Sequence, residues 1–325
     1  MNAPSVKAQK PRVAMTGATG FVGLKTLNLF HEQGHEVVAL VRDKQRACTL
    51  LPANTLMIEG DLGNQRALDE LAGSADLVLH VAGAISAAND AAFAEANVAG
   101  TRNVANAALK AGVRRFVHVS SLAAREPGLS AYCRTKAEGE AVVIALEDKL
   151  DWIVIRPPAV YGPGDKATLP LIQQLSQSTS FLTGTENQRI SVIHVDDLAR
   201  ALVAAFSGKV AARKVYEVDD ATPGGYAWAD LAAASGESLR HVPKVKLLPK
   251  LLLELAGAAC GLAKTVTGKS IILSPGKVRE LYHEDWVIHG PRLDETGHWQ
   301  PQVRFAQGFA DTLEWYKKNG WLPES

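Results

Sequence analysis

Three evenly spaced glycines near the start of the chain constrain its fold more than any other feature. Gly17, Gly20 and Gly23 follow the apolar run 13–15 and precede a helix predicted over 21–33. In a strand–turn–helix unit, Gly17 can make the tight turn, Gly20 can let backbone amides approach a pyrophosphate, and Gly23 can let the helix pack against a sheet. The helix N-terminus then offers unpaired N–H groups to phosphates. The alternative is a structural turn without a ligand, but the context favours a dinucleotide-binding turn.

Strands and helices alternate along the first 156 residues. Continuous apolar runs, typical of a parallel sheet buried on both faces, predict strands over 13–15, 37–41, 56–58, 77–81, 116–119 and 152–155. Helices are predicted between them, over 21–33, 64–73, 90–112 and 130–148. This order predicts an α/β fold, a Rossmann-type doubly wound parallel sheet with right-handed crossovers.

The alternation loosens in the second half of the chain. Pro and Gly are dense over 157–164, which predicts a loop. Two strands, at 190–195 and 215–218, are expected to return at least partly to the sheet. Helices are predicted over 196–207, 226–236, 247–264, 276–283 and 304–318. A smaller, mostly helical C-terminal substrate domain is therefore expected.

These patterns predict the limits of each part of the chain. They are a disordered lead (1–11), a dinucleotide-binding Rossmann domain (12–162, with return elements at about 188–218) and a substrate-binding region (163–187 and 219–325).

Composition excludes several classes of protein. Hydrophobic residues make up 47% of the chain, which is typical of globular proteins. The 35 Lys and Arg against 34 Asp and Glu argue against a nucleic-acid partner. The widely spaced Cys48, Cys133 and Cys260 form no C-x-x-C pair, so we predict neither a disulfide framework nor a metal site. This use of cysteine predicts a reducing, cytoplasmic location. The lead has no apolar segment typical of a secretory signal, and the apolar stretch 247–263 contains charges, so no transmembrane segment is predicted.

The ends of the second and third strands bear on the cofactor. Arg42 lies 19 positions after Gly23, where enzymes that prefer NAD carry an acid. Because an arginine can pair with a 2′-phosphate, NADP(H) is preferred and NAD(H) remains possible. Arg46 could assist, or Asp43 could hold the ribose as in an NAD enzyme. Asp61 could accept from the adenine amino group or cap the next helix.

Tyr132 and Lys136 form a Y-x-x-x-K pattern on the helix after the fifth strand. Residues four apart share one helix face. A phenol has a pKa near 10, and a nearby ammonium and an oxidised nicotinamide would favour its phenolate. Tyr132 could then exchange a proton with a substrate oxygen. Ser120 and Ser121 end the fifth strand, where a hydroxyl could hold that oxygen or cap the strand end.

As a set, these motifs resemble the extended short-chain dehydrogenase/reductase family, which is NAD-dependent epimerase/dehydratase-like. T-G-A-T-G-F-V-G, G-D-L, H-V-A-G, N-V-A-G-T, V-S-S, Y-x-x-x-K, R-P-P-A-V-Y-G-P-G and H-V-D-D occur in the family's order between about 12 and 207. The last third more loosely resembles the dihydroflavonol reductase and 3β-hydroxysteroid dehydrogenase branch. It is also similar to the NAD(P)H-binding accessory subunit of respiratory complex I.

The resemblance implies roles for individual residues. Tyr132 would be the general acid/base, and Lys136 would lower its pKa and bind the nicotinamide ribose. Ser121 would polarise the substrate oxygen, with Ser120 as the fallback, and Asn97 would support a proton-relay water. The implied cofactor-binding residues are Gly17, Thr19, Gly20, Phe21, Val22, Gly23, Arg42, Asp61, Leu62, Ala82, Gly83, Tyr132, Lys136, Pro157 and Val160. His194 and Asp197 would be structural.

Substrate choice is expected to reside in 163–185 and 222–285. Their apolar side chains are Leu169, Leu171, Ile172, Phe181, Leu182, Tyr226, Trp228 and those of 247–255. Such a lining favours a lipophilic small molecule, although the same side chains could build the core of the second domain. The leucines at 251, 252, 255 and 262 could instead form an interfacial helix at a membrane.

The sequence thus predicts an NADP(H)-dependent oxidoreductase that moves hydride between nicotinamide and a secondary alcohol or ketone. One alternative is a nucleotide-sugar epimerase or dehydratase with tightly bound NAD. Arg189 could bind a diphosphate there, but Arg42 and the short segment before Tyr132 argue against it. The other is a non-catalytic NADPH-binding assembly or sensor protein resembling the complex I accessory subunit. The resemblance also implies a homodimer through the helices at 90–112 and 130–148.

Overall fold

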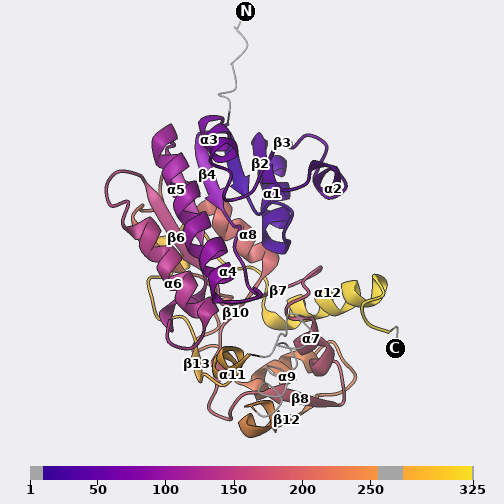
Figure 1. The fold of residues 1–325 in the computed structure, drawn as a ribbon. Helices are drawn as coiled ribbons and strands as arrows, with labels where there is room; N and C mark the ends of the chain where they lie inside the picture. Colours follow the sequence, from indigo (N-terminus) through magenta and orange to yellow (C-terminus); the bar gives the residue numbers. More distant parts are fainter. Residues whose placement is uncertain (1–9, 255–273, 324–325) are drawn as a thin grey trace, which may run out of the picture.

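The computed structural model describes residues 10–254 and 274–323 (Figure 1). Its centre is a seven-stranded sheet of order β11-β6-β5-β4-β1-β2-β3, with every neighbouring pair parallel. The strands are β1 (Val13–Thr16), β2 (Val37–Val41), β3 (Leu56–Glu59), β4 (Leu77–His80), β5 (Arg115–Val119), β6 (Trp152–Arg156) and β11 (Lys214–Glu217). The predicted Rossmann-type α/β fold is confirmed.

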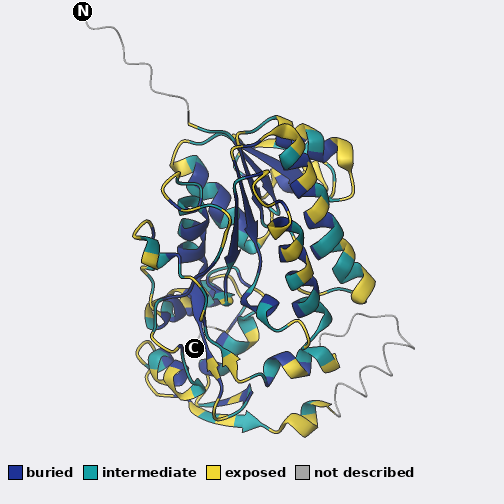
Figure 2. Cartoon of the chain, turned by 90° about the vertical axis from the view of Figure 1, so that its left-hand side faces the viewer, coloured by how far each residue is buried: buried dark blue, intermediate teal, exposed yellow. Residues whose placement is uncertain are grey.

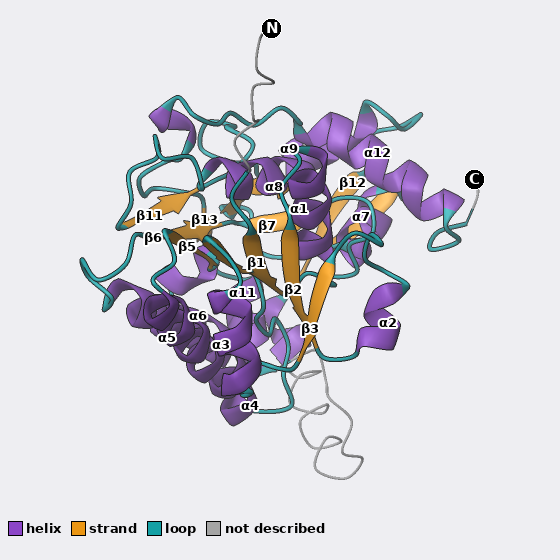
Figure 3. Cartoon of the chain, turned by 90° about the horizontal axis from the view of Figure 1, so that it is seen from above, coloured by secondary structure: helices purple, strands orange, loops and turns teal. Residues whose placement is uncertain are grey.

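Helices cover both faces of this sheet (Figure 3). α1 (Phe21–Glu32) and α8 (Val195–Ala204) pack on one face, and their apolar side chains share one core cluster with inward residues of the strands. α3 (Gln65–Gly73), α5 (Gly100–Ala111) and α6 (Ala131–Ile144) pack on the other face, over a second cluster. Every residue of β1, β2 and β4 is buried, which explains their continuous apolar runs.

Shorter elements connect these layers. They are α2 (Lys44–Cys48), α4 (Asp90–Ala94), a π-helical turn (Glu95–Ala99) and a 3₁₀ turn (Leu122–Arg125). The helix predicted over 90–112 is therefore α4, the π-helical turn and α5 in succession. Because π-helical turns often mark functional sites, the position of Asn97 within this one is of interest.

The C-terminal region forms a third core beneath the carboxyl edge of the sheet. It contains α7 (Leu169–Leu175), α9 (Trp228–Gly236), α11 (Pro275–Leu281), a 3₁₀ turn (Asp294–Thr296) and α12 (Phe305–Lys318). Ile172, Leu231 and Phe309 are completely buried in its cluster. Figure 2 shows that exposed residues concentrate on the outer sides of the helices, whereas the central strands are buried.

Three small two-stranded parallel sheets depart from the sequence predictions. β7 (Ala159–Tyr161) pairs with β10 (Val192–His194), so part of the predicted loop 157–164 is a strand. The predicted strand 190–195 is divided between β10 and β9 (Arg189–Ile190), which pairs with β13 (Asp285–Trp286), and only β11 joins the large sheet. These short pairings join distant segments, and no local periodicity signals them.

The region predicted as a helix over 247–264 also differs. Leu247 and Leu248 end strand β12 (Lys244–Leu248), which pairs with β8 (Thr179–Thr183), and only 250–254 is helical among the described residues. Its predicted continuation, with Leu255 and Leu262, lies outside the described residues, as does most of the predicted lead 1–11. Within the described part of the chain, no helix has the length and apolar character needed to span a bilayer.

Close packing of α6 against the π-helical turn gives a first prediction. A Cβ on Gly139 would lie 2.4 Å from the carbonyl oxygen of Asn97. We expect Gly139→Ala to lower the free energy of unfolding by about 1–3 kcal/mol, because the backbones must separate. Chemical denaturation measures this. Gly73→Ala, where an added Cβ meets nothing within 4 Å, is the control and should change stability by less than about 1 kcal/mol; equal losses would contradict the packing.

Candidate active site

The glycine turn between β1 and α1 leaves space that only glycine permits. Gly17 has a φ of +74°, and a Cβ there would lie 2.7 Å from the amide nitrogen of Ala82. A Cβ on Gly23 would lie 2.0 Å from the carbonyl oxygen of Gly17, so this glycine accommodates the turn itself rather than the sheet. Thr19 and Gly20 are exposed, and no side chain caps α1 at Gly20. The open helix N-terminus fits the pyrophosphate of a dinucleotide.

The end of β2 separates the two candidates for the ribose. The carboxylate of Asp43 caps α2 by accepting the Arg46 N–H at 2.9 Å, which gives it a structural role. The side chain of Arg42 is exposed, and no carboxylate of the described residues lies within ion-pairing distance of it. Arg42 is therefore better placed than Asp43 to meet a ligand phosphate. Arg46 is also exposed.

The residues after β3 have local partners. Asp61 accepts the N–H of Gly63 at 2.9 Å, whereas α3 is capped by Asn64, which accepts the N–H of Ala67 at 3.1 Å. The alternative that Asp61 caps this helix is therefore wrong, and its contact with adenine stays a prediction. Leu62 packs on α5, since a Cβ on Gly100 would lie 2.6 Å from its Cδ1.

The segment after β4, with Ala82 and Gly83, lies between the glycine turn, Asn97 and Lys136. Its Ala82 N–H donates to the Thr16 hydroxyl at 3.3 Å, next to the glycine turn. A Cβ on Gly83 would lie 3.0 Å from Asn97 Oδ1 and 3.9 Å from Lys136 Nζ. The turn, Gly83 and Lys136 therefore meet at the carboxyl edge of the sheet, where open α/β sheets bind their ligands.

Lys136 is held by the end of β5. Its Nζ donates to the carbonyl oxygen of Val119 at 2.9 Å, and the residue is 7% exposed. Burial lowers the pKa of this ammonium to about 8, and the neighbouring Glu140 carboxylate opposes the shift. The amine is therefore held beside Gly83, and its contact with the nicotinamide ribose stays a prediction.

Tyr132 lies one helical turn before Lys136 and is half-buried, with its ring centroid 6.2 Å from that of Phe93. Burial raises the pKa of the phenol to about 12, and a side-chain hydrogen bond with Ser121 acts in the opposite direction. This is opposite to the lowered pKa expected from the sequence, because desolvation has the largest effect. The phenol of the protein alone is consequently protonated at neutral pH.

The structure distinguishes between the two serines. The hydroxyl of Ser120 donates to the buried carboxylate of Glu140. Glu140 also accepts from Arg156, with Nε at 2.8 Å and Nη2 at 2.6 Å, and Arg156 lies 3.5 Å from Glu217 of β11. Ser120 therefore belongs to a buried ionic network that joins α6 to β5, β6 and β11. Ser121 is the serine next to the phenol.

Sequence reasoning missed Glu140, although a signal was present. Tyr132, Lys136 and Glu140 are spaced four residues apart and lie on one face of α6. A buried carboxylate without a cation would be strongly unfavourable, so its pairing with Arg156 is a stringent constraint on the position of the helix.

His80 is a second residue that sequence reasoning missed. Its Nδ1 lies 2.7 Å from the Thr16 hydroxyl and its Nε2 lies 3.1 Å from that of Thr101. Because the Thr101 hydroxyl donates to the Asn97 carbonyl at 2.8 Å, it accepts from His80, which assigns the proton to Nε2. Burial lowers the pKa of His80 to about 3, so the ring is neutral. This chain of hydrogen bonds joins the glycine turn to Asn97.

The amide of Asn97 is engaged by protein groups. Its Oδ1 accepts the Ala84 N–H at 2.7 Å, and its Nδ2 donates to the Ala84 carbonyl at 3.1 Å and to the Thr135 hydroxyl at 3.1 Å. Asn97 therefore fixes the segment after β4 against α6. Its predicted support of a relay water stays a prediction.

The remaining predicted residues lie beyond β6. The carbonyl of Pro157 accepts the N–H of Leu122 at 2.8 Å, and Val160 is half-buried in β7; their contact with nicotinamide stays a prediction. His194 caps α8, and the Asp197 carboxylate accepts the N–H groups of Gln302 and Val303 at 2.8 Å each. These contacts agree with the structural roles expected for His194 and Asp197.

The C-terminal region packs beside the phenol. Arg279 of α11 donates to the carbonyl of Leu129 at 2.8 Å, and a Cβ on Gly276 would lie 2.9 Å from the Cβ of Ser130, the N-cap of α6. Arg125 donates to the carbonyl of Asp285 at 2.9 Å. The segment around α11 therefore borders the site at the N-terminus of α6.

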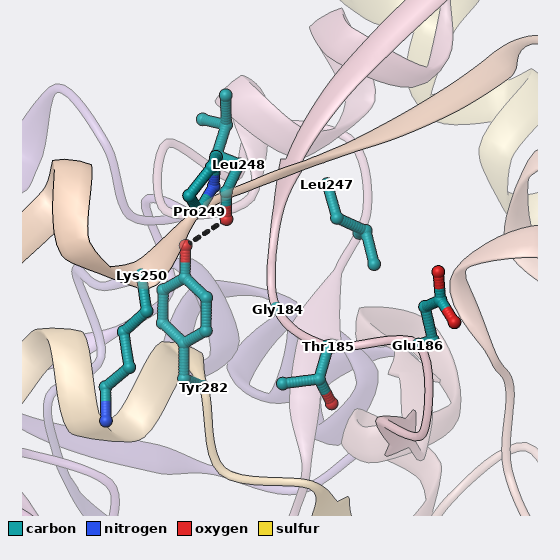
Figure 4. Close-up of a pocket in the computed structure, with 8 residues that line it drawn as sticks. All are labelled: Gly184, Thr185, Glu186, Leu247, Leu248, Pro249, Lys250 and Tyr282. Atoms are coloured by element: carbon teal, nitrogen blue, oxygen red, sulfur yellow. Dashed lines mark hydrogen bonds between the residues drawn. The ribbon is translucent and has the colours of Figure 1, made fainter.

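A pocket of about 430 Å³ lies at the C-terminal end of α11, where Tyr282 lines it (Figure 4). It is lined by Gly184, Thr185, Glu186, Leu247, Leu248, Pro249, Lys250 and Tyr282. The Tyr282 hydroxyl donates to the Leu248 carbonyl at 2.6 Å, which joins the end of α11 to β12. The lining combines apolar side chains with Glu186 and Lys250.

Most apolar side chains expected near the substrate have a structural role instead. Ile172 and Leu182 are buried in the third core, and against it pack Leu169, Leu171, Tyr226, Trp228 and Leu247. The alternative that these apolar side chains build the core of the second domain is therefore correct for this group.

Arg189, a candidate diphosphate ligand, is exposed and donates to the carbonyls of Gly224 and Gly225, so it stabilises a turn.

The fold and the glycine turn define a Rossmann-type enzyme of the NAD(P)-binding class. The sequence model of the NAD dependent epimerase/dehydratase family matches residues 13–218. The chain belongs to this family, whose members are of the extended short-chain dehydrogenase/reductase type, and the predicted family is confirmed.

Individual relatives include reductases and dehydrogenases. The chain is 36% identical over 313 residues to a ceramide reductase of Caulobacter vibrioides (strain NA1000 / CB15N), covering 96% of each protein. It is 26% identical to a 3-beta-hydroxysteroid dehydrogenase of Mycolicibacterium neoaurum, covering 97% of this chain and 94% of that protein. The solved structure of MoeE5 in complex with UDP-glucose and NAD has a TM-score of 0.69 at 20% identity, covering 95% of this chain and 99% of that one. The relatives indicate an NAD(P)-dependent oxidoreductase, and the solved structure supports the fold.

The burial of Lys136 predicts a pH-dependent stability. Its pKa of about 8 in the folded protein lies below the ordinary lysine pKa of 10.5. Between these values the unfolded chain binds more protons, so the contribution of Lys136 to stability becomes more favourable as pH rises. We expect the stability of the native protein relative to Lys136→Met to increase by on the order of 2 kcal/mol between pH 7.5 and about pH 9.5. Denaturation at several pH values measures this, and a constant difference would contradict the buried ammonium.

Proposed function

We propose that this protein is an NADPH-dependent reductase that converts a ketone of a lipophilic, ceramide-type substrate to a secondary alcohol. The observation that carries the proposal is the arrangement of Tyr132, with its pKa raised by burial, beside Ser121 and one turn from the anchored Lys136. A protonated phenol is the form required to donate a proton during ketone reduction.

The chain's own residues supply the proton chemistry and the positioning. When bound, the nicotinamide cofactor supplies the hydride. The Ser121 hydroxyl would hold the substrate oxygen, and the Tyr132 phenol would give its proton to that oxygen as negative charge develops there. Lys136 would bind the nicotinamide ribose and Asn97 would support a relay water. The glycine turn with Thr19, Phe21 and Val22 would bind the pyrophosphate.

The preference for NADP(H) rests on Arg42. An exposed guanidinium at the end of β2, next to an Asp43 that is engaged as a helix cap, supports recognition of a 2′-phosphate. Arg46 would assist, and Asp61, Leu62, Ala82, Gly83, Pro157 and Val160 would line the rest of the dinucleotide site. NAD(H) remains the second candidate.

The substrate class rests on the similarity to a ceramide reductase along nearly the whole chain. The similarity extends beyond residue 218, where the family model ends, into the C-terminal region that borders Tyr132. The predicted domain limits assign substrate recognition to this region. The same proposal includes a homodimer through the outer faces of α5 and α6, and a cytoplasmic location.

Replacing the phenol tests the catalytic role. Tyr132→Phe should lower turnover of a long-chain 3-keto ceramide by on the order of 10²–10⁴ fold while cofactor affinity is unchanged, because only the transferable proton is removed. NADPH oxidation followed by absorbance measures turnover. Tyr216→Phe, in β11 and outside the predicted cofactor and substrate residues, is the matched control. Native turnover in Tyr132→Phe would reject the role and favour a non-catalytic NADPH-binding protein.

Calorimetric titration tests the choice of cofactor. The native protein should bind NADPH more tightly than NADH, and Arg42→Ala should weaken NADPH binding by about 10–100 fold with little effect on NADH, because a charge-assisted contact is lost. Lys209→Ala, at an exposed position, serves as the control. A native preference for NADH, or NAD retained tightly through purification, would favour the nucleotide-sugar epimerase.

A further inference from the structure

The outer edge of the C-terminal region exposes apolar side chains that no core uses. β8 and β12 lie together at the lower end of the molecule in Figure 1. Phe181 of β8 is 49% exposed, and Leu251 and Leu252, just after β12, are 64% and 57% exposed. Val242, just before β12, is 60% exposed. We call these four residues, together with the basic residues described next, the β8–β12 edge.

Basic side chains lie among these apolar groups. Between residues 240 and 254 the chain has four basic side chains and one acid, and the basic residues are Arg240, Lys244, Lys246 and Lys250. Parallel pairing places Lys246 opposite Phe181 and Lys244 opposite Thr179, so both exposed lysines share the face of the phenylalanine. Lys246 Nζ lies 5.9 Å from the centre of the Phe181 ring.

The charge on this edge is only partly compensated. Lys250 lies 3.7 Å from Glu254, but none of the described carboxylates lies within ion-pairing distance of Lys244 or Lys246. Exposed leucines and an aromatic ring between unpaired lysines match the interface of an anionic bilayer, where apolar groups enter the acyl boundary and lysines meet the phosphates. Protein–protein interfaces are depleted in lysine, so the composition of this edge favours a bilayer over a protein partner.

The edge is also continuous with the pocket shown in Figure 4. Lys250 lines that pocket and immediately precedes the exposed Leu251 and Leu252. Leu247, Leu248 and Pro249 give the pocket an apolar side. The apolar side of this pocket, beside the edge, would offer a lipid chain a surface to contact as it leaves a bilayer.

We propose that the β8–β12 edge is a peripheral docking surface for an anionic lipid bilayer. Lys244, Lys246 and Arg240 contact lipid phosphates, and Phe181, Leu251 and Leu252 insert into the interface. The docking goes beyond the proposed reductase activity, because it needs neither cofactor nor substrate. It can therefore be tested separately from catalysis.

The test is co-sedimentation of the full-length protein with vesicles, without cofactor or substrate. We expect binding to vesicles of 70% phosphatidylcholine and 30% phosphatidylglycerol, and little binding to phosphatidylcholine alone. Because each basic residue near an anionic surface strengthens binding by about fivefold, the double variant Lys244→Glu and Lys246→Glu should lower partitioning at least about tenfold. The double variant Leu251→Ser and Leu252→Ser should also weaken binding. The size of this loss should depend little on salt concentration, because the substitutions remove apolar contacts and leave the basic residues in place.

The matched control is the double variant Lys209→Glu and Lys214→Glu, which makes the same change in net charge at exposed positions near β11. It should retain native vesicle binding, and thermal melting should show that all variants are folded. Equal loss of binding in this control would overturn the proposal, since net charge alone would explain it. Native binding by both edge variants, or changed self-association with no vesicle binding, would also overturn it.

Discussion

The position of α6 is the constraint on which the site depends. The helix is fixed by the buried pairing of Glu140 with Arg156 and by the close approach of Gly139 to the Asn97 carbonyl. Lys136 adds a hydrogen bond to the end of β5. These contacts leave α6 little freedom to rotate, so the phenol of Tyr132 is directed to the carboxyl edge of the sheet. Catalytic groups on rigid elements keep the geometry that proton transfer requires.

Much of the architecture could be predicted from the sequence because its signals are local. Buried parallel strands are continuous apolar runs, and the glycine turn has a steric reason at Gly17 that the structure shows directly. The small sheets formed by β7, β8, β9 and their partners were missed, because each joins segments that are distant in sequence. Leu247 and Leu248 were predicted as helical since an apolar run alone does not distinguish a strand from a helix.

The candidate site was predicted in part for similar reasons. Motif spacing located Tyr132 and Lys136, but it could not show that Ser120 is engaged by Glu140 or that burial raises the pKa of the phenol. Both facts depend on residues far apart in the chain. The raised pKa also differs from the lowered value that the spacing of Tyr132 and Lys136 predicts, because desolvation of the phenol has the largest effect.

The central claim is that this phenol faces a nicotinamide bound over the opening glycines. A crystal structure of the protein with NADP⁺ tests it most directly. Our account predicts the pyrophosphate at the N-terminus of α1, with the Tyr132 oxygen within hydrogen-bonding reach of a ketone oxygen placed at the nicotinamide ring. A phenol directed into solvent, or a dinucleotide bound away from the glycine turn, would contradict it.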